Sequence, residues 1–351
     1  MSGNSVFGWA IVGPGSIANR FAEAVQGTEG MALVAAQGRD RGRSTEFARR
    51  WSREGKPVAS AGNIAELLDD DLVDAIYVAT PHAFHADAIR RAIGARKAVL
   101  CEKPLVPDLA SGLEAVALSR KHRVFLMEAV WTRFLPVYED VRGWIRDGAI
   151  GKIRAIQSSF CFNLPFDAKH RAYDPLQAGG ALLDLGVYNL TMTRWALCEA
   201  LGECPPLQSL HASGVKGPTG VDHRIAATLE FSGGITSQFV CGFDASADNT
   251  LRIVGERGTI AVPMFWQATE ARLHAGKERA EVHRPFRVNG FEYEAEEAVR
   301  VIGAGGVESP GIPHSDTLET LRWMCRIREL VGVRYPFEAA AGAAEQFQPG
   351  E

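Results

Sequence analysis

FGWAIVGPGSIA (residues 7–18) decides the fold, because an apolar run ends there in a glycine-rich turn that opens a helical pattern. A strand, a G-x-G-x-x-small turn and a helix in this order are the pattern of a dinucleotide-binding βα unit. Gly13 permits the tight turn, Gly15 lets the backbone approach a pyrophosphate, and Ala18 lets the helix pack on the strand. The positive end of the helix dipole also favours phosphate. The predicted cofactor contacts of this turn are Gly13, Pro14, Gly15, Ser16 and Ile17, although a plain strand–helix turn gives the same local pattern.

Short apolar runs and helical patterns alternate over residues 1–130. Strands that are apolar throughout and separated by helices predict a parallel, doubly wound Rossmann sheet. The predicted strands span residues 7–13, 32–38, 74–80, 98–103 and 124–129, and the predicted helices lie near residues 16–27, 41–53, 63–69, 83–95 and 108–121.

The pattern changes after residue 130. Helices are predicted near residues 136–147, 180–197 and 314–330, but from residue 208 onward apolar runs follow one another with Gly and Asp/Asn turns between them. Such spacing favours a large, mostly antiparallel sheet. The predicted fold class is therefore α/β, with a Rossmann domain over residues 1–130 and a C-terminal α/β domain over residues 131–351. An open sheet exposes a face that a second copy can cover, which predicts a homodimer or a dimer of dimers.

Composition excludes several classes of function. The 351 residues are 46% hydrophobic and 23% charged, with a formal net charge of -4, as in an ordinary soluble protein with no broad basic surface for nucleic acid. No apolar run reaches the roughly 20 residues that span a bilayer, and no signal peptide is evident. The six cysteines form no C-x-x-C pair and the nine histidines no HExxH motif, so no metal site is predicted. These features predict a cytoplasmic protein with a small-molecule partner.

The end of the second predicted strand indicates which dinucleotide binds. AAQGRDRGR (residues 35–43) places Arg39 where NAD sites carry an acidic residue, with Arg43 one helical turn further on. An arginine can form charge-assisted bonds to a 2′-phosphate, each about 1.5–3 kcal/mol. NADP is therefore favoured. NAD stays possible, because Asp40 could turn toward a ribose and the arginines could be only a solvated helix start.

Five motifs together resemble one family: GPGSIA (13–18), YVATPHAFHAD (77–87), CEKPL (101–105), MEAVWTRFLP (127–136) and GGALLDLGVY (179–188). In order and spacing they are similar to the glucose-fructose oxidoreductase/inositol dehydrogenase/MocA family of nicotinamide-dependent oxidoreductases. Within it they look most like the branch of dimeric dihydrodiol dehydrogenases and NADP-dependent D-xylose 1-dehydrogenases. The resemblance spans nearly the whole chain.

The resemblance implies roles for individual residues. Lys103 would be the catalytic lysine, with Asp184 and Tyr188 as its partners on the substrate side. The other positions would contact the cofactor: Thr80, Pro81 and His85 on a cofactor-facing loop, and Glu102, Trp131 and Arg133 near the nicotinamide half. Two positions depart from many relatives, which carry Asn at the place of His82 and His at the place of Tyr188. Enzymes of the inositol type, with a histidine base, are therefore the less similar kin.

The chemistry at Tyr188 follows from its proton. Oxidising an alcohol moves a hydride to the nicotinamide and a proton to a base. A tyrosine acting near pH 7 needs its phenolate stabilised by roughly 3 pKa units, about 4 kcal/mol, and an ammonium about 4 Å away contributes on the order of that amount. Residues four apart share a helical face, so Asp184 and Tyr188 would both face the substrate. Both could also be ordinary core residues.

The remaining candidates line the substrate side. Phe160, Phe162 and Trp266 could form an aromatic wall or be plain core, and Arg171 could bind a substrate hydroxyl or form a salt bridge. Gly179, Gly180 and Gly186 would let the helix backbone approach the ligand.

These residues predict an NADP-dependent oxidoreductase that acts on a sugar or a cyclic diol, similar to a dihydrodiol or aldose 1-dehydrogenase. One alternative is a reductase of keto- or anhydro-sugars. Another, of a different class, is a regulator that senses a dinucleotide or a sugar without turnover. The presence of both Lys103 and Tyr188 argues against the regulator.

Overall fold

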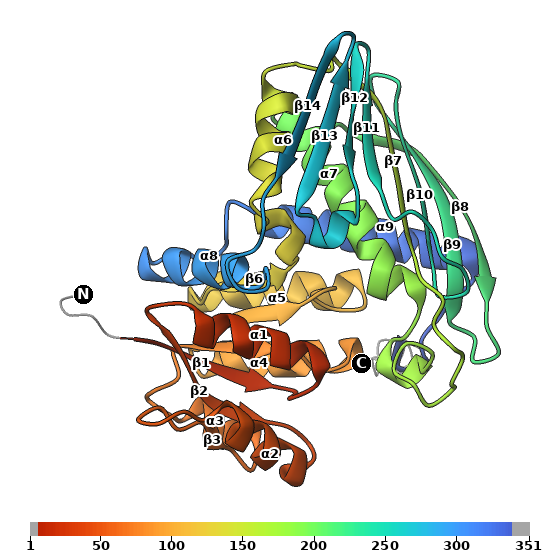
Figure 1. Cartoon of the computed structure of the whole chain (residues 1–351). Helices are drawn as coiled ribbons and strands as arrows, with labels where there is room; N and C mark the ends of the chain where they lie inside the picture. The colour runs from red at the N-terminus through yellow and green to blue at the C-terminus, as the bar shows by residue number, and fades with distance from the viewer. Residues whose placement is uncertain (1–5, 339–351) are drawn as a thin grey trace. The chain divides into compact units, whose positions relative to one another are not determined.

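The computed structural model describes residues 6–338, and the chain divides into two compact units. The first unit holds Met1–Glu139 and His283–Glu319, and the second holds Asp140–Val282 and Thr320–Glu351. The first unit therefore recruits a segment from late in the chain, whereas the sequence predicts a single boundary near residue 130. Figure 1 shows the elements of both units.

A six-stranded sheet forms the centre of the first unit. Its order is β3-β2-β1-β4-β5-β6, and every neighbouring pair is parallel. The strands are β1 (Phe7–Val12), β2 (Met31–Gln37), β3 (Ala59–Ser60), β4 (Ala75–Val78), β5 (Ala98–Glu102) and β6 (Leu126–Ala129). This confirms the doubly wound sheet and its five predicted strands, to which the structure adds the two-residue β3.

The strands are apolar throughout because side chains pack on both faces of the sheet. Trp9 of β1 is buried and meets Phe21 edge-on, at 5.1 Å between ring centroids. Phe21 in turn stacks on Tyr77 of β4, with centroids 3.7 Å apart. Each such buried ring contributes roughly 1.5–3 kcal/mol, so this contact fixes the first helix on the sheet.

The five helices predicted before residue 130 lie close to their predicted ranges, whereas the helix at Glu292–Gly303 was not predicted. Three of the five begin at an Asp or Asn that caps the first turn. Asp40, Asn63 and Asp108 each accept a backbone N–H of the helix that follows. The elements are α1 (Ser16–Gly27), α2 (Arg41–Trp51), α3 (Ile64–Leu68), η1 (His82–Phe84), α4 (His85–Gly94), α5 (Leu109–His122), η2 (Trp131–Phe134) and α8 (Glu292–Gly303). Two more, α6 (Val137–Arg146) and α9 (His314–Val331), contain a unit boundary. Over residues 6–338 no helix combines the length and the apolar character needed to cross a membrane.

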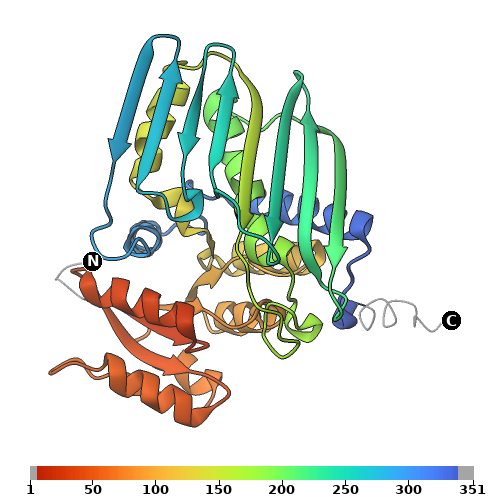
Figure 2. The same ribbon diagram turned by 45° about the vertical axis from the view of Figure 1, so that its right-hand side comes forward.

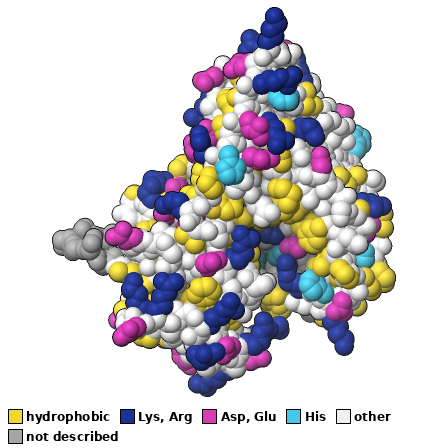
Figure 3. Space-filling model, viewed as in Figure 1, with side chains coloured by type: hydrophobic (Ala, Val, Ile, Leu, Met, Phe, Trp, Pro, Cys, Tyr) yellow, Lys and Arg dark blue, Asp and Glu magenta, His cyan; other side chains and the backbone are white. Residues whose placement is uncertain are grey.

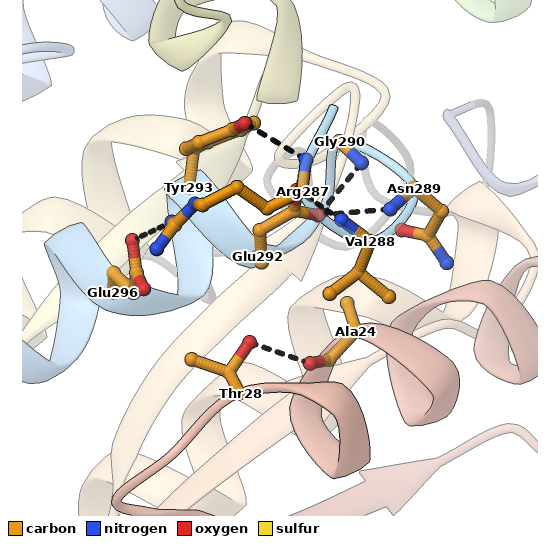
Figure 4. Close-up of polar contacts among 9 residues, drawn as sticks. All are labelled: Ala24, Thr28, Arg287, Val288, Asn289, Gly290, Glu292, Tyr293 and Glu296. Atoms are coloured by element: carbon orange, nitrogen blue, oxygen red, sulfur yellow. Dashed lines mark hydrogen bonds and ion pairs between the residues drawn. The ribbon is translucent and has the colours of Figure 1, made fainter. Parts of the chain in front are cut away.

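A single carboxylate organises the loop before α8 (Figure 4). Glu292 is fully buried and accepts four backbone N–H groups, at 2.7–3.1 Å. The donors are Arg287, Val288, Asn289 and Gly290. Asn289 then exchanges hydrogen bonds with Arg20 of α1, at 2.9 and 3.1 Å. This loop therefore joins the late segment to the first helix.

The second unit contains an eight-stranded sheet in the order β14-β13-β12-β11-β7-β10-β9-β8. β7 and β10 are parallel, whereas the pairs β7–β11, β11–β12, β12–β13, β10–β9 and β9–β8 are antiparallel. The strands are β7 (Ile153–Cys161), β8 (Leu207–Lys216), β9 (Asp222–Phe231), β10 (Ile235–Gly242), β11 (Leu251–Gly255), β12 (Gly258–Val262), β13 (Glu270–Ala275) and β14 (Glu278–His283). The mostly antiparallel sheet predicted from the sequence is thus confirmed.

One face of this sheet is packed and the other is open. Helix α7 (Val187–Leu201) contacts β7 and β10 on the packed face, and within the described residues Figure 2 shows no helix over the other. Side chains alternate accordingly, as in β7, where Ile156 is buried and Gln157 is exposed. The open face carries a shallow hollow of about 620 Å³ whose lining includes Gln157, Thr228, Gln238 and Arg252.

Candidate active site

The glycine turn after β1 has the shape and charge of a phosphate site. Gly13 has φ +93°, and a Cβ there would lie 2.7 Å from the backbone nitrogen of Thr80. Around Gly15 there is space instead, since the nearest atom to an added Cβ would be the Gly13 carbonyl oxygen, at 4.0 Å. Gly15 is also the N-cap of α1, which has no capping side chain and no acidic residue in its first turn. These residues therefore fit the pyrophosphate of a dinucleotide.

The hydroxyl of Thr80, beside this turn, also favours a ligand site here. The Thr80 hydroxyl follows β4, is buried and has no hydrogen-bond partner among the described residues. Buried polar atoms are normally paired, so an unpaired hydroxyl beside the glycine turn suits a ligand. The neighbouring Pro81 is half-buried at the same loop.

The end of β2 carries the predicted adenosine-side residues. The Arg39 guanidinium lies over the ring of Phe84, 5.4 Å from its centroid. Asp40 caps α2 by accepting the Arg43 backbone N–H at 3.1 Å, so this carboxylate is already engaged. Lys and Arg side chains (dark blue) are prominent in Figure 3 over the region where Figure 1 labels α2. The surroundings are basic, as a 2′-phosphate requires.

Lys103 stands at the carboxyl end of β5, where parallel sheets bind ligands. It is half-buried, and its peptide bond to Pro104 is cis. The preceding Glu102 is buried and accepts a short hydrogen bond from the Tyr77 hydroxyl as well as the Lys103 backbone N–H. The turn that carries Lys103 is therefore held by β4 as well as by its own strand.

His85 supports this turn from beneath. Its ring is fully buried, with Nε2 2.8 Å from the Thr80 carbonyl and Nδ1 3.0 Å from the Pro104 carbonyl. Burial lowers the pKa of His85, so the ring is neutral near pH 7. The buried ring of His85 thus links the segment after β4 to the turn after β5, which argues against direct contact between His85 and a cofactor.

Two buried carboxyl groups, one acted on by the charge of Lys103 and the other by that of Glu102, were not predicted from the sequence. Glu128 accepts the Leu105 N–H at 3.1 Å and the Thr317 hydroxyl at 2.7 Å, and burial raises its pKa to about 7. Glu294 is fully buried with no hydrogen-bond partner among the described residues, and burial followed by the charge of Glu102 raises its pKa well above the usual value. Glu128 stands inside the quoted MEAVWTRFLP motif, whereas no local pattern marks Glu294.

Trp131 and Arg133 have partners inside the first unit. Trp131 is buried and stacks on Phe291, with centroids 4.6 Å apart and Arg20 over its ring. Arg133 is buried and forms an ion pair with Asp316 at 3.0 Å. Both residues, expected near the nicotinamide, are thus fixed in position by the late segment of the chain.

The second unit carries the other half of the predicted catalytic set. The predicted helix over residues 180–197 begins instead as a π-helical turn, η4 (Leu182–Gly186), and continues as α7. Asp184 lies in the π turn and Tyr188 in the first turn of α7, and both are buried. Arg171 forms an ion pair with Asp184 at 3.4 Å, which confirms the salt-bridge alternative for this arginine.

Aromatic rings surround Tyr188. Phe160 meets the Tyr188 ring edge-on at 5.6 Å and stacks on the half-buried Trp266, with centroids 4.1 Å apart and planes 19° apart. Phe162 is 38% exposed and packs near Phe243, at 5.7 Å. The structure therefore clusters the three predicted aromatic residues around Phe160, which contacts the Tyr188 ring. Trp266 lies in the short 3₁₀ turn η5 (Phe265–Gln267), and another such turn, η3 (Pro175–Gln177), precedes the π turn.

Gly179, Gly180 and Gly186 were expected to let the helix backbone approach a ligand, but the structure shows them packed against other parts of the protein. A Cβ at Gly179 would lie 2.7 Å from the Ala172 carbonyl oxygen, and one at Gly180 would lie 2.3 Å from Asp222 Oδ1. At Gly186 it would lie 3.0 Å from Cys241 Sγ. The close approach that these glycines permit is to the protein's own atoms and not to a ligand, which corrects the prediction.

Comparison with known proteins gives matches over nearly the whole chain. The model of an oxidoreductase family with an NAD-binding Rossmann fold matches residues 7–130, and the GFO/IDH/MocA C-terminal domain matches residues 138–261. The trans-1,2-dihydrobenzene-1,2-diol dehydrogenase of Mus musculus is 34% identical over 338 residues, which cover 93% of this chain and 98% of that protein. The Homo sapiens protein of the same name is 33% identical over 337 residues, with the same coverage of 93% and 98%.

Solved structures of similar fold include sugar-active enzymes. An aldose-aldose oxidoreductase from Caulobacter crescentus, complexed with glycerol, superposes with a TM-score of 0.79 at 26% identity, covering 93% of this chain and 97% of that one. KijD10, a 3-ketoreductase from Actinomadura kijaniata in complex with NADP, gives a TM-score of 0.76 at 25% identity with the same coverage of 93% and 97%.

Proposed function

Since the chain belongs to the GFO/IDH/MocA oxidoreductase family, we propose that it transfers a hydride between NADP and a ring carbon bearing a hydroxyl group in a cyclic diol, with Lys103 and Tyr188 handling the proton. The protein is a nicotinamide-dependent oxidoreductase that acts on CH–OH groups. The observation that carries the choice of a diol is the 34% identity to a dihydrodiol dehydrogenase over 98% of that protein's length.

The second unit supports a flat, hydroxylated ring as substrate. Phe160 and Trp266 form a stacked aromatic pair next to Tyr188, and such a pair offers an apolar surface to a ring. The Arg171–Asp184 ion pair offers a donor and an acceptor for neighbouring hydroxyl groups. Because Phe160 is buried and Trp266 is half-buried, a substrate ring would pack on Trp266 and extend its hydroxyls toward the charged pair.

The proton follows from the residue types. A bound nicotinamide supplies the hydride acceptor. In oxidation the Tyr188 phenolate, stabilised by the Lys103 ammonium, takes up the hydroxyl proton and becomes a neutral phenol. In reduction Tyr188 donates the proton, which needs no lowered pKa. Glu102 and His85 contact the backbone of the turn that carries Lys103, and these contacts fix the backbone position from which the ammonium group extends.

NADP is preferred over NAD in this proposal because of Arg39 and Asp40. Phe84 supports the Arg39 guanidinium, and the Asp40 carboxylate is engaged as a helix cap instead of facing a ribose. Titration with each dinucleotide tests the preference. Equal affinity for NADP and NAD, together with an unchanged ratio in Arg39→Ala, would contradict it.

A reductase of keto-sugars is the second candidate. The likeness in fold to a 3-ketoreductase and to an aldose oxidoreductase, at 25% and 26% identity, favours it over other reactions. The Arg171–Asp184 pair also suits a polyhydroxylated substrate.

One panel separates these functions. Absorbance of the reduced nicotinamide is followed with cyclic trans-diols, aldoses and keto-sugars, each with NADP(H) and NAD(H). Turnover with diols and NADP supports the proposal, and turnover restricted to sugars supports the second candidate. Cofactor binding without turnover on any substrate would leave the sensing regulator as the function.

The catalytic assignment needs its own variants. Lys103→Ala and Tyr188→Phe are expected to lower kcat by a factor of about 100 or more, the usual contribution of general acid–base catalysis, without changing the Kd for NADP. Near-normal turnover in either variant would refute the assignment.

The uncovered sheet face supports a homodimer or a dimer of dimers. β7, β10, β9 and β8 leave one face without a covering helix among the described residues, and stable dimers commonly bury about 1,200–2,000 Å² in total. Sedimentation velocity tests this assembly. A dimer that dissociates in Val240→Glu, on the open face of β10, supports it, and a monomeric wild-type chain at micromolar concentration refutes it.

A further inference from the structure

The segment that carries Asp184 and Tyr188 starts from a strained turn. Gly180 has φ +125°, a conformation that other residues rarely adopt. The turn is held on both sides, because the Tyr335 hydroxyl donates to the Gly179 carbonyl at 2.6 Å and the Gly180 N–H donates to the Ala172 carbonyl at 2.8 Å. The Asp184 N–H then donates to the Gly180 carbonyl at 3.2 Å. The position of Asp184 is thus tied directly to this turn.

Asp222 is the residue that fixes the end of the turn. It opens β9, lies forty residues from its partner and is fully buried, and its Oδ2 accepts the Leu182 N–H at 2.6 Å. Leu182 is the first residue of the π turn. The other oxygen, Oδ1, has no hydrogen-bond partner among the described residues and lies against Gly180, where a Cβ would come within 2.3 Å. The Asp222 carboxylate therefore fills the space that a side chain at position 180 would need.

Burying a carboxylate without a salt bridge costs free energy. Burial raises the pKa of Asp222 to about 6, against the hydrogen bond from Leu182, which lowers it. The charged and titratable groups that face it are Arg328 of α9, Tyr335 beyond that helix and Cys241 of β10. Arg328 forms its ion pair with Glu338, at 2.7 Å, and packs its guanidinium over the Tyr335 ring at 4.8 Å. Asp222 thus remains a buried acid whose strongest contact is a backbone N–H.

We infer that Asp222 is a positioning residue for the catalytic helix: its hydrogen bond to Leu182 sets the π turn, and through that turn the places of Asp184 and Tyr188. This inference rests on the proposed function. A carboxylate accepts the Leu182 N–H more strongly than a protonated acid does, because hydrogen bonds to a charged acceptor are the stronger ones. The turn is therefore held most firmly above about pH 6, and protonation of Asp222 loosens it.

Two substitutions test this. Asp222→Ala removes the acceptor, and Asp222→Asn keeps an acceptor of the same shape without the titration. The matched control is Glu230→Gln, which removes an exposed acid on the same strand. For each protein, kcat is measured from pH 5 to 9, the Kd for NADP is measured by titration, and amide hydrogen exchange is followed over residues 181–190.

Asp222→Ala is expected to lower kcat at least tenfold and to speed exchange over residues 181–190, with the Kd for NADP unchanged. Asp222→Asn is expected to keep kcat within about threefold of the wild type at pH 8, and its exchange protection over residues 181–190 should not fall below about pH 6, where that of the wild type should fall. Glu230→Gln should match the wild type throughout.

The outcomes distinguish the two claims. If the wild type turns over and Asp222→Ala keeps both its exchange protection and its kcat, Asp222 does not position the helix. An Asp222→Asn protein whose exchange protection over residues 181–190 still falls below pH 6 overturns the inference too. If the wild type shows no turnover on any substrate but Asp222→Ala still loosens residues 181–190, the proposed function fails while the anchoring of the turn stands. Should Asp222→Ala not fold, the pH dependence of exchange in Asp222→Asn decides alone.

Discussion

Replacing Gly15 with alanine is expected to separate cofactor binding from folding, because the protein does not fill the space beside this residue. An added Cβ would have its nearest neighbour at 4.0 Å, and the backbone at φ -101° and ψ -163° is open to alanine. Alanine is a poorer N-cap than glycine, whereas its lower entropy in the unfolded chain stabilises by about 0.4–1 kcal/mol. These effects oppose each other, so the free energy of unfolding without cofactor should change by less than about 1 kcal/mol.

Cofactor binding should respond quite differently, because the same Cβ enters the space that the pyrophosphate requires. We expect the Kd for NADP to rise at least tenfold, which is about 1.4 kcal/mol of binding free energy. At a concentration of NADP one hundred times the wild-type Kd, the stabilisation by ligand would fall from about 2.7 to about 1.4 kcal/mol. Fluorescence titration with NADPH and denaturant unfolding with and without NADP measure both quantities.

Gly13→Ala is the matched comparison. Its backbone has φ +93°, and an added Cβ would lie 2.7 Å from Thr80 N and 2.8 Å from Ala79 O, so this variant should lose at least about 1–3 kcal/mol of stability without any cofactor. The reasoning is refuted if Gly15→Ala binds NADP with the wild-type Kd, or if it destabilises the apo protein as much as Gly13→Ala.

Three further changes test separate parts of the site. Phe84→Ala removes the ring under Arg39, worth about 0.5–1 kcal/mol, so the Kd for NADP should rise about two- to fivefold while that for NAD stays constant in the same titration. Arg171→Ala breaks the ion pair with Asp184. Steady-state kinetics should show a KM for substrate that is severalfold higher, and titration should show an unchanged Kd for NADP. Glu128 holds its proton to about pH 7 in the folded protein against 4.5 in the unfolded chain, so the stability it contributes is complete below pH 4.5 and is lost as the pH rises through 7. Glu128→Gln does not titrate, and its free energy of unfolding relative to the wild type should increase between pH 5 and 8 by up to about 3 kcal/mol; a constant difference would contradict this.

The sequence predicts the first unit well because its signals are local. FGWAIV is apolar throughout and GPGSIA follows it directly, so both β1 and the start of α1 can be read from neighbouring residues. β3 has only two residues, Ala59 and Ser60, and no periodicity exists over so short a strand. The return of residues 283–319 to this unit depends on contacts such as Asn289 with Arg20, 269 positions apart, which no local pattern records.

In the candidate site, too, local motifs identify residues, whereas contacts between distant residues set their geometry. Lys103, Asp184 and Tyr188 were identified from motifs, and the structure gives them a strand end, a π turn and a helix start. A helical pattern does not distinguish an α from a π turn, because the choice is made by the positive φ of Gly180 and by a carboxylate forty residues away. The sequence shows that His85 follows the β4 strand, but not that its ring is buried against the carbonyl of Pro104, at the end of another strand.

Two buried carboxylates show why a backbone anchor can be either constant or sensitive to pH. Burial raises the pKa of Glu292, yet N–H groups of the loop before α8 outweigh it and its pKa is lowered. Asp222 accepts the Leu182 N–H, but burial outweighs the backbone hydrogen bonds that lower its pKa, which is raised to about 6. The balance between burial and the backbone donors therefore decides the sign of the pKa shift. Glu292 stays charged over the range in which enzymes work, whereas the π turn is the anchored part of the site whose restraint changes with pH.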